Sequence, residues 1–137
     1  MLYLVPLGRF LYSAIFLMTV LGHFSAGYIG YAAQAGVPAP GLLVPLSGVI
    51  AILGGLSITL GYKAKIGAWL IVLFLVPVTL KMHNFWAVTD PMMHGIQMAL
   101  FMKNVSMLGA ALLITHFGAG PVSFDAQRAA PASPRVG

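Results

Sequence analysis

The sequence contains no cysteine and few charged residues. Without cysteine, a chain of 137 residues cannot form a disulfide, act through a thiol or hold an iron–sulfur cluster by its own thiolates. Only 7% of its residues are charged, whereas a soluble domain has about 25%. Hydrophobic residues make up 60% of the chain. Because so few charges could not cover a globule of this size in water, we expect much of the apolar surface to contact lipid.

Four long apolar segments account for most of the chain. They lie at about residues 6–24, 42–60, 66–82 and 96–116, and each is close to the roughly 17–25 residues that span a bilayer as a helix. Lipid offers the backbone no hydrogen-bond partner, so these segments must be helical. None shows the alternating polarity of a membrane strand. The sequence therefore predicts an all-α membrane protein, built as a bundle of four transmembrane helices.

Two segments lie outside these spans and the short turns between them. Residues 25–41 have no charge but contain Tyr28 and Tyr31. Because tyrosine favours the membrane interface, we expect a short interfacial helix or a loop between the first two spans. The transmembrane domain covers residues 1–118. Residues 119–137 are rich in proline, alanine and serine, and this composition predicts a flexible cytoplasmic tail.

The basic residues predict how the protein is oriented. Four spans put both termini and the loop between spans two and three on one side of the membrane. Five of the seven basic residues lie on that side: Arg9, Lys63, Lys65, Arg128 and Arg135. The opposite side has Lys81, and Lys103 is embedded in the fourth span. The positive-inside rule then places both termini in the cytoplasm. Since the basic residues form no stripe, nucleic acid is excluded as a partner.

Small residues recur every four positions along the second span, at Ser47, Ala51, Gly55 and Thr59. Such a stripe lets a neighbouring helix backbone approach closely. The simplest interpretation is close packing within the bundle, and a homo-oligomer formed through the same face is the alternative.

Lys103 and Asn104 stand side by side within the apolar fourth span. Polar residues at such a depth mark a functional site by default. Lys103 could instead extend its amine towards the outer interface. Asn104 is too short to do so, and its amide could serve as a hydrogen-bonding link between helices. Asp90, the one acid outside the tail, is expected to pair with Lys81 or Lys103.

The histidines allow several interpretations. Each of them alone is satisfied as an interfacial residue. His23, His83 and His94 could converge from three segments as metal ligands, but no short-spaced ligand motif supports a metal site, and we predict none. His23 and His83 could face each other across a haem, which is equally unsupported. A quinone headgroup would need only donors in an apolar slot, which Lys103 and Trp86 could provide together with His83 and Asn104.

Several motifs carry a family resemblance: Gly8-Arg9-Phe10, Gly36-Val37-Pro38, Gly54-Gly55 followed by Gly61-Tyr62-Lys63-Ala64-Lys65, His83-Asn84-Phe85-Trp86, and Phe101-Met102-Lys103-Asn104 followed by Gly109. In this order, over about residues 5–118, they resemble the DoxX family of small bacterial membrane proteins. The resemblance implies a four-helix unit in the bacterial inner membrane. It also implies association with thiosulfate:quinone oxidoreduction or with thiol and oxidative-stress complexes. The acid that some members have before the glycine pair is absent here, as is cysteine.

Two functional hypotheses follow. In the first, the chain is an accessory or quinone-interacting subunit of a membrane redox or oxidative-stress system, with a membrane or soluble redox protein as partner. In the second, it is a non-catalytic scaffold or small-molecule carrier whose polar cluster is structural. The sequence indicates no catalytic residue. The candidate cofactor-binding residues are His23, His83, Asn84, Trp86, Lys103 and Asn104, with quinone favoured over haem.

Overall fold

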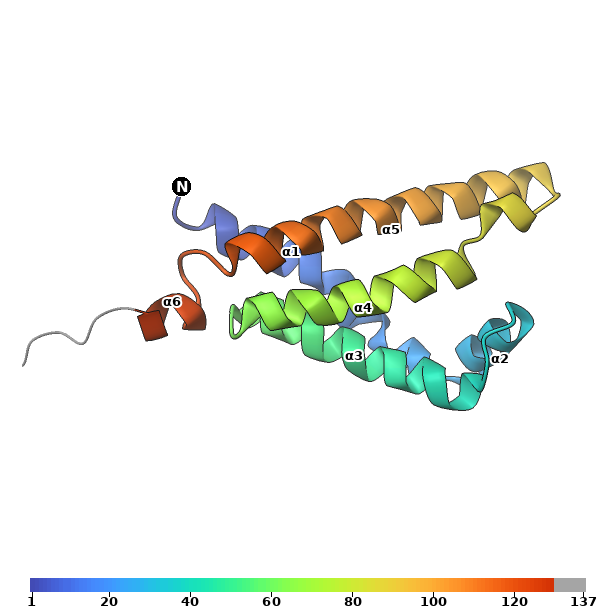
Figure 1. Ribbon diagram of the computed structural model, residues 1–137, viewed down its shortest axis with the longest axis horizontal. Helices are drawn as coiled ribbons and strands as arrows, with labels where there is room; N and C mark the ends of the chain where they lie inside the picture. Colours follow the sequence, from blue (N-terminus) through green and yellow to red (C-terminus); the bar gives the residue numbers. More distant parts are fainter. Residues whose placement is uncertain (130–137) are drawn as a thin grey trace, which may run out of the picture.

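The computed structural model describes residues 1–129, which are almost entirely helical (Figure 1). In chain order the elements are α1 (Leu4–Thr19), the 3-10 helix η1 (Val20–Phe24), α2 (Ala26–Gln34), α3 (Pro40–Leu60), α4 (Ala64–Met82), the 3-10 helix η2 (Phe85–Ala87), α5 (Pro91–Phe117) and α6 (Phe124–Ala129). Within residues 1–129 there is no strand, so the all-α prediction is confirmed.

Four of these helical stretches are long and apolar enough to cross a membrane, as predicted. They are Leu4–Phe24, Pro40–Leu60, Ala64–Ala87 and Pro91–Phe117. The fourth begins five residues earlier than the sequence indicated, because Asp90 and Pro91 start a helix in what had been assigned to a loop. The Asp90 side chain accepts a hydrogen bond from the Met93 amide, 2.8 Å away, and so caps α5.

The central helix is α3, which packs against α1 on one side and α4 on the other, while α4 also packs against α5. Glycines permit both of the α3 contacts. A Cβ atom at Gly54 would lie 2.9 Å from the Gly67 carbonyl oxygen on α4, and one at Gly55 would lie 3.3 Å from the Phe16 Cβ on α1. Helix α1 reaches α5 through the Tyr12 hydroxyl, which donates to the Met107 carbonyl at 2.9 Å. Packing within the bundle thus explains much of the small-residue stripe.

The segment between spans one and two contains a helix, α2, which lies at one end of the bundle (Figure 1). The Ser25 side chain caps its start by accepting from the Tyr28 amide. The Tyr28 ring packs so closely on Gly22 that a Cβ atom there would lie 2.5 Å from a ring carbon. This contact folds α2 back onto η1 instead of leaving it free on the membrane surface.

The opposite end of the bundle is held together by residues 119–129. The Arg9 guanidinium, whose side chain is 5% exposed, donates to the carbonyls of Ala119 and Val122. The Asp125 carboxylate accepts from the amides of Lys63, at 2.7 Å, and Ala64, at 3.0 Å. We call this the closed end: the start of α1, the α3–α4 turn and residues 119–129.

These contacts give residues 119–129 bonded partners in the bundle, and the flexible cytoplasmic tail stays a prediction. A segment of low apolar content can still pack on a bundle when it provides hydrogen-bond partners for the amides and carbonyls at helix ends, which have none within their own helix. The amides at the start of α4 need an acceptor, and Asp125 provides it. The rest of the predicted tail, residues 130–137, lies outside the described residues.

Candidate functional site

A cavity of about 860 Å³ lies at the other end of the bundle, which we call the cavity end. Side chains of α1, η1, α2, α3, α4 and α5 line it. Cavities that hold small organic ligands are typically about 300–1,000 Å³. Residues 25–41 close part of it, because Tyr28, Tyr31, Val37 and Pro38 are among its lining residues.

The lining changes from apolar to polar along the membrane normal. Phe16 on α1, Ile50 on α3 and Met107 on α5 lie towards the middle of the bundle and are apolar. The polar lining residues lie nearer the helix ends: His23, Tyr28, Tyr31, Lys81 and His83, with Ser47, Thr19, Lys103 and Asn104 at intermediate positions. The cavity therefore has an apolar interior and a polar end, which suits an amphipathic molecule better than a wholly polar one.

Asn104 is the most distinctive lining residue. It is only 4% exposed, yet within residues 1–129 its side chain makes no hydrogen bond. By helical rise it lies about 10 Å deeper than Gln97, seven residues earlier on α5. Within residues 1–129 the one fully buried side-chain polar atom without a partner is Arg9 Nε, so the Asn104 amide is reached from the cavity that Asn104 lines. The prediction that Asn104 would bond to another helix is therefore not met within residues 1–129.

Two lysines line the same cavity, Lys81 from α4 and Lys103 from α5. Lys81 Nζ lies 3.8 Å from the position that a Cβ atom would take at Gly36, so the amine extends across to the loop after α2. The predicted pairing of Asp90 with one of these lysines is corrected by the structure. Its carboxylate caps α5 instead, accepting from the Met93 amide, one of the amides that the first turn of a helix leaves without a partner.

A short hydrogen-bond chain joins three elements at the cavity end. His83 Nδ1 donates to Gln97 Oε1 at 2.8 Å, and Gln97 Nε2 donates to the Tyr31 hydroxyl at 3.3 Å. The end of α4 is thereby connected through α5 to α2. His23 Nδ1 donates to the Thr19 carbonyl at 3.1 Å, which holds its ring against the cavity.

The structure thus brings together four of the six predicted site residues: His23, His83, Lys103 and Asn104. Asn84 and Trp86 do not line the cavity. Trp86 is 58% exposed and stacks edge-to-face with Phe85 and Phe101. Both residues follow the end of α4, where the chain leaves the cavity. Their closeness to His83 in the sequence did not reveal this change of direction.

Sequence reasoning did not select Lys81, Tyr31 or Gln97 as site residues. A signal existed for Gln97, because it lies seven residues before Asn104 and so on the same face of one helix. In the structure Gln97 is hydrogen-bonded to both His83 and Tyr31. No comparable signal existed for Tyr31, which arrives from a helix whose packing the sequence left open.

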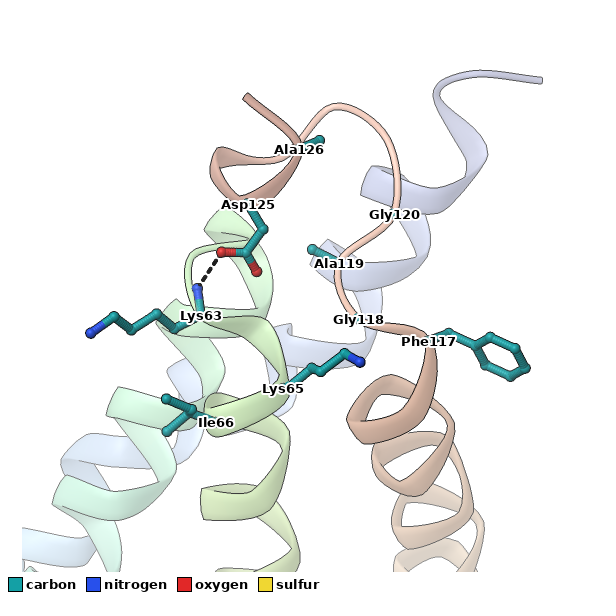
Figure 2. A pocket seen from close by; sticks show the side chains of 9 residues that line it. All are labelled: Lys63, Lys65, Ile66, Phe117, Gly118, Ala119, Gly120, Asp125 and Ala126. Carbon is teal, nitrogen blue, oxygen red and sulfur yellow. Dashed lines mark hydrogen bonds between the residues drawn. The ribbon is translucent and has the colours of Figure 1, made fainter. Parts of the chain in front are cut away.

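A second cavity, of about 500 Å³, lies at the closed end (Figure 2). Figure 2 shows the Asp125 carboxylate directed at the Lys63 amide, the Lys65 side chain directed towards Gly118, and the Lys63 amine pointing away. The one acid here already binds two backbone amides. No residue like Asn104, buried and without a side-chain hydrogen bond, is among the residues that line this cavity within the described part of the chain.

The four long apolar helices define a class, that of multi-pass helical membrane proteins. The sequence model of the SURF4 family matches residues 44–130, more than half of the chain. The chain belongs to the SURF4 family.

Two relatives agree with this assignment. The inner membrane protein YphA of Escherichia coli (strain K12) is 31% identical over 99 residues, covering 72% of this chain and 70% of that protein. The ER-derived vesicles protein ERV29 of Saccharomyces cerevisiae (strain ATCC 204508 / S288c) is 29% identical over 80 residues, or 58% of this chain and 26% of that protein. No solved structure matches the chain significantly.

These matches correct the DoxX resemblance, which was wrong. The motifs behind it include glycines at close helix contacts, Gly54 and Gly55, and polar residues near a span end, such as His83. Close packing and interfacial position favour such residues in helical membrane bundles generally. Their order along the chain was therefore weaker evidence of a family than a match over 87 consecutive positions, residues 44–130.

Proposed function

We propose that this protein is a non-catalytic membrane protein that binds an amphipathic small molecule in the cavity lined by Asn104. The observation that supports this most strongly is the Asn104 side chain, 96% removed from solvent and without a partner among residues 1–129. A ligand with a polar headgroup would provide the missing hydrogen bond. Its apolar part would occupy the chamber between Phe16, Ile50 and Met107.

Binding is favoured over a purely structural role by the size of the space. A structural asparagine in a membrane bundle would be expected to bond to a neighbouring helix, but here it faces a cavity of about 860 Å³. Replacing the gap by packed side chains would remove the need for a ligand, and the fold does not do this. The carrier form of the earlier alternative hypothesis is therefore preferred to the scaffold form.

The quinone-linked redox role rested on the DoxX resemblance and loses that support with it. A quinone is still an amphipathic molecule with hydrogen-bond acceptors, so it belongs among the probes. A redox protein partner and a homo-oligomer have no observation of their own in their favour. The printed names of the relatives, an inner membrane protein and a protein of ER-derived vesicles, fit a role within a membrane.

The test is a binding panel on the purified full chain. Native mass spectrometry from non-ionic detergent would measure one-to-one adducts with dodecanoate, dodecanol, dodecyltrimethylammonium and decylubiquinone. We expect at least one to bind, and Asn104→Leu to weaken it about tenfold, the loss of one good hydrogen bond. Ser106→Ala is the matched control, since Ser106 lies on the same helix, bonds only to the Met102 carbonyl and does not line the cavity.

Two results would reject the proposal. One is the absence of any adduct across the panel, and the other is equal binding by wild type and Asn104→Leu. Binding of decylubiquinone alone would instead return the quinone hypothesis to first place.

We further propose that the chain lies in a bacterial inner membrane with both termini in the cytoplasm. The supporting observation is that more basic residues lie at the closed end than at the cavity end: Arg9, Lys63, Lys65 and Arg128. A reporter fused after residue 137 that is active only in the periplasm should be inactive. Activity of that reporter would reverse the orientation.

A further inference from the structure

From the charges around the Asn104 cavity we infer that its ligand is a single-chain amphiphile with an anionic headgroup, held by Lys81 and Lys103. This inference rests on the proposed function and specifies its ligand class. The two lysines come from different helices, α4 and α5, and both line the cavity.

Neither acidic side chain of this protein is paired with these two lysines in the described residues. It contains only two acidic residues, Asp90 and Asp125. Asp90 binds the Met93 amide at the start of α5, and Asp125 binds the Lys63 and Ala64 amides at the closed end. Neither lines the cavity. An anion that binds both lysines inside the cavity would therefore not be an acidic side chain of residues 1–129.

The other polar groups at the cavity end fit the same headgroup. His83 Nδ1 is hydrogen-bonded to Gln97, and His23 Nδ1 is hydrogen-bonded to the Thr19 carbonyl. The Tyr31 hydroxyl accepts a hydrogen bond from Gln97. Asn104 adds an N–H donor deeper in the cavity. A carboxylate or phosphate accepts hydrogen bonds at several oxygens and binds amines through charge-assisted bonds, which are about twice as strong as neutral ones. A trialkylammonium headgroup would meet two like charges.

The chamber beneath the headgroup is suited to one acyl chain. It extends from the level of His83 and Gln97 to Met107, which is ten residues of α5 or about 15 Å by helical rise. Its deeper wall is apolar, formed by Phe16, Ile50 and Leu75 among others. Lys103 on α5 and Thr19 on α1 both line the cavity and are both exposed. These two helices do not pack closely against each other. An amphiphile could enter from the bilayer between them.

The experiment compares headgroups on one chain length. The probes are dodecanoate, dodecyl phosphate, dodecanol and dodecyltrimethylammonium, titrated into the full-length protein in non-ionic detergent and followed by native mass spectrometry. We expect an anionic probe to bind at least tenfold more tightly than dodecanol and dodecyltrimethylammonium to bind most weakly. The ratio of dodecanoate to dodecyl phosphate then identifies a fatty acid or a phosphate-bearing lipid as the source.

Substitutions assign the effect to the two lysines. Lys81→Gln and Lys103→Gln should each weaken the anionic probe about tenfold and leave dodecanol unchanged, while Lys81→Arg and Lys103→Arg should retain most of the binding. Lys65→Gln, at the closed end, is the matched control and should change nothing. Both target lysines are exposed side chains, so their variants are expected to fold.

The outcomes separate this inference from the proposed function. If dodecanol binds as tightly as the anionic probes and Asn104→Leu still weakens it, the cavity binds an amphiphile but the anionic class is wrong. If the lysine variants bind anionic probes normally, the lysines interact only with bulk lipid and the inference is overturned. If no probe binds at all, the proposed function itself has failed.

Discussion

The two ends of the bundle treat buried polar groups in opposite ways. At the closed end, the Arg9 guanidinium donates to two carbonyls, although its Nε finds no acceptor within residues 1–129, and Asp125 accepts from two amides. At the cavity end, Asn104 is equally buried but its side chain has no hydrogen-bond partner within residues 1–129, and two lysines line the same cavity.

This difference separates a structural from a functional use of polarity. Buried polar groups that are hydrogen-bonded hold structural elements in place. Buried polar groups without a hydrogen bond raise the free energy of the folded protein, and a ligand that bonds to them can lower it. The closed end joins the start of α1, the α3–α4 turn and residues 119–129 into one unit. The cavity end has no such closure beyond the chain of bonds from His83 to Tyr31. Removing Arg9 should therefore cost much more stability than removing Asn104.

The largest loss of stability should come from Arg9→Met, which keeps the apolar stem and removes both bonds to residues 119–122. We expect the free energy of unfolding to fall by about 2 kcal/mol, since hydrogen bonds from a charged group contribute about 1.5–3 kcal/mol. Thermal unfolding in non-ionic detergent measures it. Trypsin cleavage after Arg128 should also accelerate as residues 119–129 detach.

Arg128→Met is the matched control for this substitution when stability is measured. Arg128 is exposed and lies over the Tyr62 ring, 4.6 Å from its centroid. An exposed contact of this kind contributes about 0.5–1 kcal/mol. Equal losses from the two substitutions would mean that residues 119–129 do not hold the closed end together.

An intermediate effect is expected from Asp125→Ala, which removes the acceptor at the start of α4. Loss of a helix cap costs about 1 kcal/mol, and detachment of α6 should add protease sensitivity at Arg128. Asp90→Ala is the natural comparison, because it removes the cap of α5 at the other end. It should cost a similar amount without exposing Arg128. Faster cleavage in both variants would show that the two ends are coupled rather than separate.

The smallest change in stability is expected at the cavity end, from Asn104→Leu. Removing an unpartnered amide and keeping its volume should leave the free energy of unfolding within about 0.5 kcal/mol of wild type. The same substitution should weaken ligand binding about tenfold, as described above. A loss of 2 kcal/mol or more in thermal unfolding would mean that Asn104 has a structural partner, and the contrast between the two ends would disappear.

The sequence predicted the helical spans well because hydrophobic length is a local property. The run around Lys103 can be recognised without knowing what packs beside it. Depth along a span is also local, and for this reason His23, His83, Lys103 and Asn104 could be grouped before any contact was known. All four line one cavity.

Other features of the site depended on direction rather than depth. Trp86 lies near the same end of the bundle as the site, but it follows the end of α4 and does not line the cavity. Its ring packs edge-to-face on Phe85 and Phe101. Tyr31 was assigned only to an interface, although its helix folds back to reach Gln97. Asp90 was expected to meet a lysine and caps its own helix instead. Each case turns on the path of the chain at a helix end, where backbone geometry decides and hydrophobicity gives no guidance.

By itself, then, the sequence determined that this protein is a four-span helical membrane protein, since 60% hydrophobic and 7% charged residues leave lipid as the only solvent for its surface. Tertiary structure decided which polar groups are satisfied. Asp125 meets amides some sixty residues away, while Asn104 meets none of its possible partners among residues 1–129. The physical reason is that apolar length acts within a segment, whereas a hydrogen bond requires two distant groups to be brought within about 3 Å.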